Sequence, residues 1–440
     1  MTLVIIGANP KVARAAGTLP VDVVHVQAPG AAPLDAGTPT VLVHDFRDPA
    51  TFPAFVDLVL APLGVAAVVS LSEPGLEPAA LAAARLKATG TPPEVVRATR
   101  DKLAMRRVLA RRAPHLNLAF AAGDDPDAVA ALFAAHPRVV AKPVDGSGST
   151  SVTLLHRGEG LPADRRTSAT IVEQFATGAE FSVEALSRGG SHTVMGIAEK
   201  GTGDGFVEVS HMMPPPSLGP ERRRAVERAV GELLDALDIT DGPSHTEVKV
   251  DGDRVTVIET HNRLGGDGIA DLVRLTTGAD WRRAALGWAV GVGPERDGSA
   301  PVAAAASVFL TAPAGRVTSV APRPAPRHAE IVEWEVTARP GDEVPPLRSS
   351  ADRLGMAVLT APSTAACARA VDELTSAHVI RTGPLPPAPG AAGTGPVSGT
   401  PGTTRTGAAS ETPGTTRTGP GAVTAASAAT EVPRPRKASA

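Results

Sequence analysis

The sequence predicts an α/β protein of several domains that ends in a tail without a core. Over residues 1–98, apolar runs of strand length alternate with helical patterns. Near residue 250, two short strands flank a turn, and each strand carries a glutamate. From residue 384 onward Pro, Gly, Ala, Ser and Thr dominate. A chain of 440 residues is long enough for two or three domains with a large core.

The first 98 residues predict a small parallel α/β domain. Its expected strands are TLVII, VDVVHVQ, TVLVHDF and VAAVVSLSE, and AALAAARLKATG predicts a helix that ends at Gly90. The segment GANPKVARAAG lacks the Gly-x-Gly-x-x-Gly spacing, so we do not expect a dinucleotide site there. Glu73 stands at the end of the last strand, where it could reach a substrate or simply begin the next helix.

Later segments predict helices that pack against a core. Residues 221–238 carry one apolar stripe at 225, 226, 229, 230, 233, 234 and 237, which is typical of a helix with one buried face. Strand and helix patterns return over 300–383, with an apolar helix near 364–377. The single cysteine, Cys367, falls in that helix and is expected to be a small buried side chain.

Composition excludes several functional classes. A net charge of −3 gives no reason to expect a nucleic-acid or membrane-surface partner. One cysteine excludes an intrachain disulfide framework, which fits a reducing cytoplasm. MTLVIIGANP has no basic region of a signal peptide, and no run approaches the roughly 18 apolar residues of a membrane helix. We therefore expect a cytoplasmic protein with small-molecule partners.

The most informative segment is a predicted hairpin of residues 245–250 and 254–259 around a three-residue turn, Asp251-Gly252-Asp253. This turn predicts that Glu247 lies directly opposite Glu259. Two carboxylates at so short a distance repel each other unless a cation lies between them. However, most acidic residues beside hairpins are simply solvated. An arginine and a Gly-Gly pair follow, which is an unusual end for a strand unless the backbone must approach something closely. Together these parts suit magnesium held against a phosphate chain.

Several segments resemble the ATP-grasp superfamily in the order that this superfamily shows. VIETHNRLGGDGI resembles the end of the ATP-grasp core, whose pattern is roughly Glu-x-Asn-x-Arg-x-Gly-Gly. The segments upstream that also resemble it are TRDKLAMRRVL (99–109), VVAKPVDGSGSTSV (139–152), IVEQFATGAEFSVEAL (171–186) and GFVEVSHMMPPPSL (205–218). The last of these resembles the substrate side of the carboxylate–amine ligase branch, in particular L-amino acid ligases. The resemblance covers roughly residues 1–383.

The resemblance implies a domain organisation. We expect an N-terminal pre-ATP-grasp α/β domain over 1–98, and an α+β ATP-grasp core with a mobile lid over 99–292. A small C-terminal α+β domain follows over 293–383. Residues 384–440 are expected to be disordered, because their composition cannot bury enough surface to offset chain entropy.

The resemblance also implies which residues contact ATP. Lys102 and Lys142 would contact phosphates, and Ser149 lies in the glycine loop that would close over them. Glu173 would lie beside the adenine amino group, and Glu180 would accept from the ribose hydroxyls. The base would further contact backbone groups of Gln174 and Phe175 and the side chain of Ala176. The family usually has Gly where this chain has Ser151. Taken alone, each of these residues could equally be an ordinary surface or loop residue.

The implied metal is Mg²⁺ (or Mn²⁺), held by Glu247 and Glu259. The family usually has Asn as the third ligand, and here that position is His261, followed by Asn262. Magnesium prefers oxygen, which favours Asn262, whereas strand alternation places His261 on the side of Glu259. The sequence leaves this choice open but favours His261.

Arg263 and Lys142 are the implied catalytic residues, with Arg263 facing the transferring phosphoryl group. Gly265 and Gly266 would let backbone N–H groups approach a substrate carboxylate. Glu208 and His211, together with Glu73, are candidates for substrate contact, although a structural role is an alternative for His211.

The function implied is an ATP-dependent carboxylate–amine ligase that forms an amide or peptide bond through an acyl phosphate, with an amino acid as the expected substrate. Such catalysis needs no side-chain nucleophile. One alternative is a bicarbonate-activating carboxylase or carbamoyl-phosphate-type enzyme. Another is a non-catalytic ATP-binding protein, for which the departures at His261 and Ser151 are an argument. A homodimer is possible, but no motif decides the oligomeric state.

Overall fold

The computed structural model describes residues 1–35, 37–38, 40–203, 205–296 and 298–385. From residue 386 onward the predicted tail lies outside the described residues. Residues 1–386 form one unit by their contacts, so the boundaries expected after residues 98 and 292 stay predictions. In the described ranges, no helix combines the length and hydrophobicity that crossing a membrane requires.

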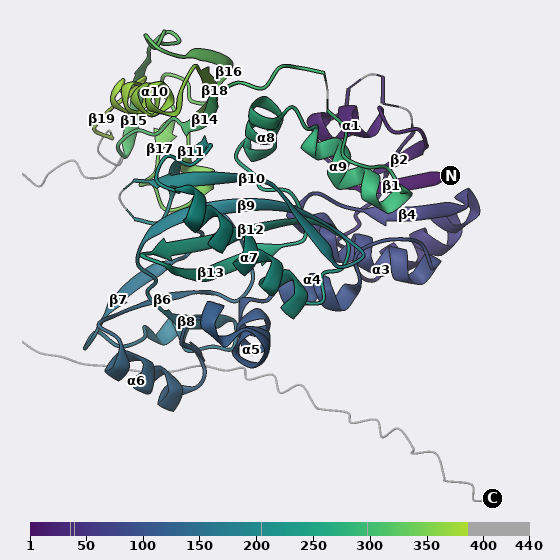
Figure 1. Ribbon diagram of the computed structural model, residues 1–440, viewed down its shortest axis with the longest axis horizontal. Helices are drawn as coiled ribbons and strands as arrows, with labels where there is room; N and C mark the ends of the chain where they lie inside the picture. Colours follow the sequence, from purple (N-terminus) through teal and green to yellow (C-terminus); the bar gives the residue numbers. More distant parts are fainter. Residues whose placement is uncertain (36, 39, 204, 297, 386–440) are drawn as a thin grey trace, which may run out of the picture. The chain divides into compact units, whose positions relative to one another are not determined.

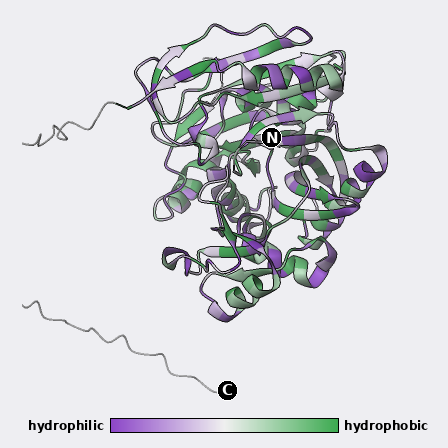
Figure 2. Ribbon diagram, turned by 90° about the vertical axis from the view of Figure 1, so that its left-hand side faces the viewer, coloured by the Kyte–Doolittle hydropathy of each residue, from purple (hydrophilic) through white to green (hydrophobic). Residues whose placement is uncertain are grey.

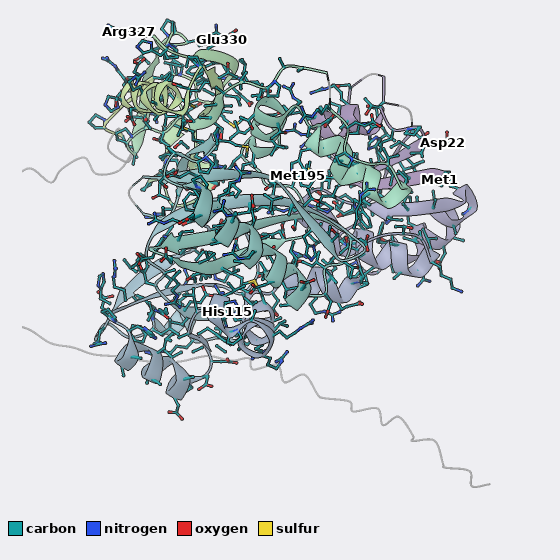
Figure 3. All side chains as sticks on the ribbon, in the orientation of Figure 1. Met1, Asp22, His115, Met195, Arg327 and Glu330 are labelled. Atoms are coloured by element: carbon teal, nitrogen blue, oxygen red, sulfur yellow. The ribbon has the colours of Figure 1, made fainter. Side chains whose placement is uncertain are left out.

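The N-terminal residues form a four-stranded parallel sheet, as the alternating pattern predicts. Its elements are β1 (Thr2–Ile6), α1 (Pro10–Ala16), β2 (Asp22–Gln27), β3 (Thr40–Val43), α2 (Phe52–Phe55), β4 (Val65–Val69) and α3 (Leu76–Leu86). The strand order is β3-β2-β1-β4. Apolar residues of α1 cover one face and those of α3 the other. Figure 3 shows Met1 at the edge of this part, and its amino group lies 3.9 Å from Asp22 Oδ2.

Helix α3 is shorter than predicted, because it ends at Leu86 and not at Gly90. Lys87 takes the left-handed conformation with a φ of 53°, and the Ala88 N–H donates to the Ala83 carbonyl. Gly90 serves tertiary packing, since a Cβ there would lie 2.8 Å from the Val68 carbonyl oxygen. The sequence pattern could not distinguish a helix cap from a close approach to a neighbouring strand.

An eight-stranded antiparallel sheet is the largest in the described chain (Figure 1). In spatial order its strands are β13 (Arg254–His261), β12 (Gly242–Asp251), β9 (Ala179–Arg188), β10 (Ser191–Thr202), β11 (Glu208–Met213), β14 (Ala304–Phe309), β18 (Gly355–Ala361) and β16 (Glu330–Val336). The last three strands come from the predicted C-terminal domain. That domain therefore continues the sheet of the core.

Helix α7 (Pro220–Ala236) covers one face of this sheet with the predicted stripe. Val226, Val230 and Leu233 pack with Phe181 and Val248 of the strands. In Figure 2 single helices carry both hydrophobic and hydrophilic residues, as expected when one face covers a sheet. Because side chains alternate along a strand, the opposite face of β9 and β12 is left to polar residues.

A second antiparallel sheet carries the glycine loop. Its strands, in spatial order, are β5 (Phe120–Ala122), β8 (Thr170–Gln174), β6 (Arg138–Pro143) and β7 (Thr153–His156). Helix α6 (Pro126–Ala135) packs on this sheet. Apolar residues of α4 (Pro93–Arg100) and α5 (Lys102–Arg112) pack instead in the core of the large sheet.

The remaining elements lie towards the C-terminal end of the described chain: α8 (Ile269–Thr277), α9 (Trp281–Gly287), β15 (Gly315–Val320), β17 (Glu343–Val344), α10 (Thr364–Ser376) and β19 (Ile380–Gly383). β17, β15 and β19 form a three-stranded sheet, and α10 packs on β14 and β18. Cys367 is fully buried in α10 as predicted, and burial raises the pKa of its thiol to about 12.

Candidate active site

A cavity of about 450 Å³ lies between the glycine-loop sheet and the polar face of the large sheet. Its size is typical of a small-molecule site. The predicted ATP contacts all line it: Lys102, Lys142, Ser149, Glu173, Gln174, Phe175, Ala176 and Glu180. Glu208, Glu247 and Glu259 line it as well. Residues up to about 150 positions apart in the sequence are thus brought together around one space.

The glycine loop after β6 is shaped by residues with positive φ. Besides Gly146 and Gly148, Ser149 and Ser151 have φ values of 57° and 60°. Glycine adopts this conformation without strain, which gives a physical reason for the family's preference for Gly at the position of Ser151. The Lys102 ammonium donates to the Gly146 carbonyl at 2.8 Å, and Ser149 Oγ donates to the Phe206 carbonyl at 2.9 Å.

Lys142 and Glu173 belong to a buried cluster of charges at the cavity wall. Arg106 Nε and Lys142 Nζ lie 2.5 Å and 2.8 Å from the two oxygens of Glu173. Burial raises the pKa of Glu173, but the two cations outweigh it and the pKa falls to about 2. The sequence analysis missed Arg106, which is fully buried. The available signal was its helical spacing from Lys102, because residues four apart share one helix face.

Two aromatic residues, Phe175 and Phe206, also line the cavity. The Arg138 guanidinium lies 4.2 Å from the ring centroid of Phe175, and the Phe206 ring lies 6.5 Å from it. The N–H groups of Gln174 and Phe175 already donate to carbonyls of Ala119 and Arg138. Any backbone hydrogen bond between these two residues and a base would therefore use their carbonyl oxygens.

Glu247 and Glu259 lie directly opposite each other on β12 and β13, as predicted, but the turn differs. Asp251 pairs with Arg254, so the turn contains two residues where three were predicted. Such a turn alone would pair Glu247 with residue 258. A β-bulge beside Glu247 shifts the register by one residue and brings the two carboxylates opposite each other.

The polar face around this pair is organised in rows across three strands. Strand pairing aligns Glu184 on β9 with His245 on β12, and His245 with His261 on β13. The neighbouring row contains Glu247 and Glu259. Two histidines and two glutamates therefore share one face of the hairpin.

Lys200 on β10 lies among three carboxylates of this face. Its Nζ is 2.8 Å from Glu180, 2.8 Å from Glu208 and 2.9 Å from Glu247. Within the described ranges, these three glutamates form the acidic group whose oxygens lie close enough to share one ion. Burial lowers the pKa of Lys200, but the carboxylates outweigh it and raise the pKa well above its ordinary value. The sequence analysis did not identify this role of Lys200.

The carboxylate pair fits a divalent cation. Burial raises the pKa of Glu247, Lys200 lowers it and Glu259 raises it, with a net value of about 2. Burial also raises the pKa of Glu259, but Lys102 and His261 hold it well below its ordinary value. Both groups are thus deprotonated at neutral pH. Ionised carboxylates on one wall of a cavity are the donors that Mg²⁺ or Mn²⁺ binds.

The two candidates for a third ligand point to different places. His261 Nε2 lies 3.2 Å from Glu259 Oε1, on the face of the carboxylate pair. Asn262 is buried, and its Oδ1 accepts a hydrogen bond from Thr99 Oγ1 at 3.0 Å. The amide oxygen is therefore engaged elsewhere. Metal ligation by His261 itself stays a prediction.

Arg263 and Glu73 form an ion pair beyond the cavity lining. Arg263 Nε donates to Glu73 Oε2 at 2.6 Å, and Arg100 Nε donates to the other oxygen at 3.1 Å. Burial raises the pKa of Glu73, but His261 and Arg263 hold it well below its ordinary value. Glu73 thus ties the N-terminal part to the end of β13. Its substrate role stays a prediction.

The Gly-Gly corner is anchored by a fully buried carboxylate that sequence reasoning missed. Glu184 accepts from the Gly265 N–H at 3.0 Å, from His245 Nδ1 at 2.6 Å and from Trp281 Nε1 at 2.6 Å. The Gly265 N–H is therefore not directed at the cavity. Gly266 has open space where a Cβ would stand, so its backbone remains approachable.

The predicted substrate residues Glu208 and His211 lie near a second ion pair. His211 Nε2 is 3.5 Å from Asp267, and Arg353 donates to both Asp267 oxygens at 2.6 Å and 2.9 Å. Ser350 Oγ donates to Glu208 at 3.4 Å. Residues of the C-terminal part thus border the substrate end predicted from the sequence, although nothing in the sequence indicated Arg353 or Ser350.

Two family models match the chain. Residues 162–271 match the ATP-grasp domain, and residues 308–383 match the L-amino acid ligase C-terminal domain 2. None of the curated proteins matches the sequence.

Solved structures with the same fold are similar over most of their length. The L-amino acid ligase from Bacillus licheniformis has a TM-score of 0.70 at 24% identity, with 87% of this chain and 98% of that chain covered. Phosphoribosylglycinamide synthetase from Anaerococcus prevotii has a TM-score of 0.65 at 16% identity, with 86% and 98% covered. Biotin carboxylase from Campylobacter jejuni has a TM-score of 0.61 at 15% identity, with 83% and 88% covered.

At these identities the structural likeness establishes the fold. The family matches add an ATP-grasp domain and a C-terminal domain of the L-amino acid ligase type. The chain thus contains an ATP-grasp domain over residues 162–271 and resembles the carboxylate–amine ligase branch, and the class of enzyme supported is an ATP-dependent ligase.

Proposed function

We propose that the protein joins the carboxylate of one amino acid to the amine of a second substrate, at the expense of ATP. The observation that supports this most is the opposed pair Glu247 and Glu259 at the phosphate side of one cavity, beside Lys102 and Lys142. The C-terminal family match supports an amino acid as the acid substrate.

The reaction has two balanced steps. A carboxylate oxygen of the first substrate attacks the γ-phosphorus of ATP, the bond to the β,γ-bridging oxygen breaks, and ADP leaves. The amine nitrogen of the second substrate then attacks the acyl carbon, loses a proton, and displaces inorganic phosphate. The products are an amide, ADP and phosphate.

The residues of the chain would act by charge and position. Lys102 and Lys142 would neutralise phosphate oxygens, and Glu180 would accept from the ribose. A divalent metal, held by Glu247 and Glu259, would neutralise charge on the β- and γ-phosphates. Arg263, which follows the end of β13, would stabilise the phosphoryl group during its transfer. No step requires a side-chain nucleophile.

The substrate amino acid would occupy the side of the cavity beyond Glu208. An α-ammonium group suits the carboxylate of Glu208, which faces the cavity. The open backbone at Gly266 and the guanidinium of Arg263 suit an α-carboxylate. His211, held by Asp267, would border the side-chain pocket.

The experiment that tests this function measures ADP release by purified protein with Mg-ATP and a matrix of amino acids, singly and in pairs. The expected result is release that requires a particular pair, with a dipeptide identified by mass spectrometry. When the acid substrate carries ¹⁸O in its carboxylate, one ¹⁸O atom should appear in the released phosphate. Release with bicarbonate alone would contradict the proposal and favour a carboxylase-type reaction.

Glu259→Gln is the matched variant for the metal role. It should fold, as judged by its circular dichroism, and lose substrate-dependent ADP release. Glu330→Gln serves as control, because this exposed residue lies on β16 far from the cavity lining (Figure 3). Equal ADP release by wild type and Glu259→Gln would overturn the metal assignment.

A further inference from the structure

Lys200 on β10 is a buried cation behind the wall of the cavity. Strand β10 pairs with β9 on one side and with β11 on the other, and β12 follows β9 (Figure 1). The Lys200 side chain is 1% exposed and does not line the cavity. Glu180, Glu208 and Glu247, on β9, β11 and β12, do line it. The lysine thus reaches the cavity only through these three carboxylates.

The three carboxylates have different tasks in the proposed function. Glu180 accepts from the ribose, Glu208 takes the α-ammonium of the amino acid, and Glu247 holds the metal. The Lys200 ammonium lies 2.8 Å from Glu180, 2.8 Å from Glu208 and 2.9 Å from Glu247. One side chain therefore contacts the residues of all three subsites.

A lysine suits this position better than an arginine. An ammonium carries three N–H groups around one compact charge, which matches carboxylates that approach from three strands. A planar guanidinium is suited instead to carboxylates that lie in its own plane. Lys249, a second lysine beside Glu180 at 3.4 Å, lines the cavity and would face the nucleotide directly. Of these two lysines, Lys200 is the one that joins the three carboxylates.

Without a cation the three carboxylates would not keep this arrangement. Their oxygens lie within 4.8 Å of one another. Like charges at this distance repel each other, so the side chains would turn apart or capture a stray cation. Either change would misdirect the groups that receive the ribose, the amino acid and the metal.

We propose that Lys200 is a positioning residue of the ligase. Its ammonium holds Glu180, Glu208 and Glu247 towards the cavity and thereby sets the ribose, amino-acid and metal contacts together. Lys200 acts through these carboxylates and contacts no ligand itself. The inference rests on the proposed function for the ligand that each carboxylate receives.

The direct test measures how much the ribose hydroxyls contribute to nucleotide binding, without turnover. Calorimetric titrations with Mg-ADP and with its 2′,3′-dideoxy analogue compare ligands that differ only in the hydroxyls that Glu180 receives. The wild type should bind Mg-ADP about tenfold or more tightly than the analogue, because a carboxylate can accept from both hydroxyls. Lys200→Met should bind the two nucleotides within about threefold of each other. A role in stability alone would leave the ratio of the two affinities unchanged.

Two further variants separate positioning from folding. Lys200→Met combined with Glu208→Gln removes one positive and one negative charge, so the net charge of the cluster stays that of the wild type. This double variant should still lose the preference for ribose hydroxyls. The control, Lys11→Met, removes a lysine that lies 2.9 Å from Asp271 and 2.6 Å from Glu333, and none of these three residues lines the cavity. It should keep the wild-type ratio.

Steady-state rates test whether one lysine serves two substrates. With the amino acid pair that stimulates ADP release most, Lys200→Met should raise the KM for ATP and the KM for the amino acid at Glu208, each about tenfold or more. Glu180→Gln should raise only the KM for ATP, and Glu208→Gln only the KM for that amino acid. A rise of a single KM in Lys200→Met would contradict joint positioning.

The outcomes distinguish this inference from the proposed function. A wild-type ratio of Mg-ADP and dideoxy affinities in the folded Lys200→Met variants would overturn the role of Lys200 and leave the ligase intact. Equal affinity of the wild type for the two nucleotides would overturn the ribose contact of Glu180, and this inference with it. Failure of the wild type to bind Mg-ADP would overturn the proposed function itself.

Discussion

Glu247 lies directly opposite Glu259, and a β-bulge beside Glu247 is what brings the two carboxylates into the same row. Both pKa values are lowered, so two negative charges persist at one wall of the cavity. Residues that act on one bound ion are expected to be strongly non-additive.

The first prediction follows from this pairing. Glu247→Gln and Glu259→Gln should each lower kcat by about 10²-fold or more, whereas the double variant should lose little beyond the worse single variant. Steady-state ADP release by the four proteins measures this coupling. Losses that multiply in the double variant would show that the two carboxylates act on separate groups.

Lys200 gives the second prediction, because it is a buried cation among three carboxylates. Lys200→Met removes the buried cation that these three carboxylates share and should cost about 3 kcal/mol or more of stability. The same variant should gain a cation site, so that millimolar Mg²⁺ or Ca²⁺ without nucleotide raises its Tm. The wild type should show no such rise.

The control for this variant is Lys249→Met, which removes a more exposed ammonium 3.4 Å from Glu180. Lys249→Met should lose less stability than Lys200→Met, and added Mg²⁺ or Ca²⁺ should not raise its Tm. In Lys200→Met burial should raise the folded-state pKa values of the three carboxylates above their unfolded values. Stability of that variant should therefore fall as pH rises above the unfolded value of about 4.3, opposite to the usual carboxylate behaviour. A flat pH profile would contradict this account of the cluster.

Much of the fold followed from local patterns. The parallel sheet, the stripe of α7, and the opposed glutamates depend on alternation and helical spacing, which neighbouring residues carry. The turn was predicted with three residues and has two, and only the bulge restored the predicted pairing. A bulge leaves no reliable mark in the sequence, because it depends on how two strands twist together.

The site residues that were missed depend on contacts between distant segments. Lys200 meets Glu247 only because β10, β9 and β12 pair side by side in one register. Glu184 reaches both His245 and Gly265 for the same reason. A single sequence records alternation along each strand but not which strands are neighbours. The charged residues that surround the motif residues could therefore be identified only from the structure.

Glu173 supplies a prediction for acid stability. Its pKa is about 2 in the folded protein against an ordinary value of 4.5, since Arg106 and Lys142 outweigh the effect of burial. A depressed carboxylate pKa contributes stability above the unfolded value that is lost as pH falls through the folded one. This group should thus contribute about 3 kcal/mol that disappears between about pH 4.5 and pH 2.

Denaturant melts over this pH range should measure the effect. Glu173→Gln should be less stable at neutral pH, because it leaves Arg106 buried without its charge partner. It should also lose less stability than the wild type on acidification from pH 4.5. Parallel pH profiles of the two proteins would show that the cluster does not control acid unfolding, and the exposed Glu330→Gln variant should match the wild type.

Ser350 links the C-terminal part to the glycine loop and gives the last prediction. Its N–H donates to the Gly148 carbonyl at 3.0 Å, while its Oγ contacts Glu208. Ser350→Pro removes both the N–H donor and the hydroxyl, whereas Ser350→Ala removes the hydroxyl alone, so the difference between the two variants isolates the N–H. The backbone accommodates this change, since Ser349 is extended and Ser350 is the first residue of a short helix, where proline is favoured.

Loss of that hydrogen bond should loosen the loop over the phosphates. A single hydrogen bond is worth about 1 kcal/mol, so the KM for ATP should rise about threefold to tenfold while kcat changes by less than about twofold. Ser350→Ala keeps the N–H and loses the contact with Glu208, so it should leave the KM for ATP unchanged. If the two variants raise this KM equally, the hydroxyl and not the backbone is the group that matters. Initial rates at saturating amino acids and varied ATP decide between these outcomes, because they isolate nucleotide binding from events at the substrate end.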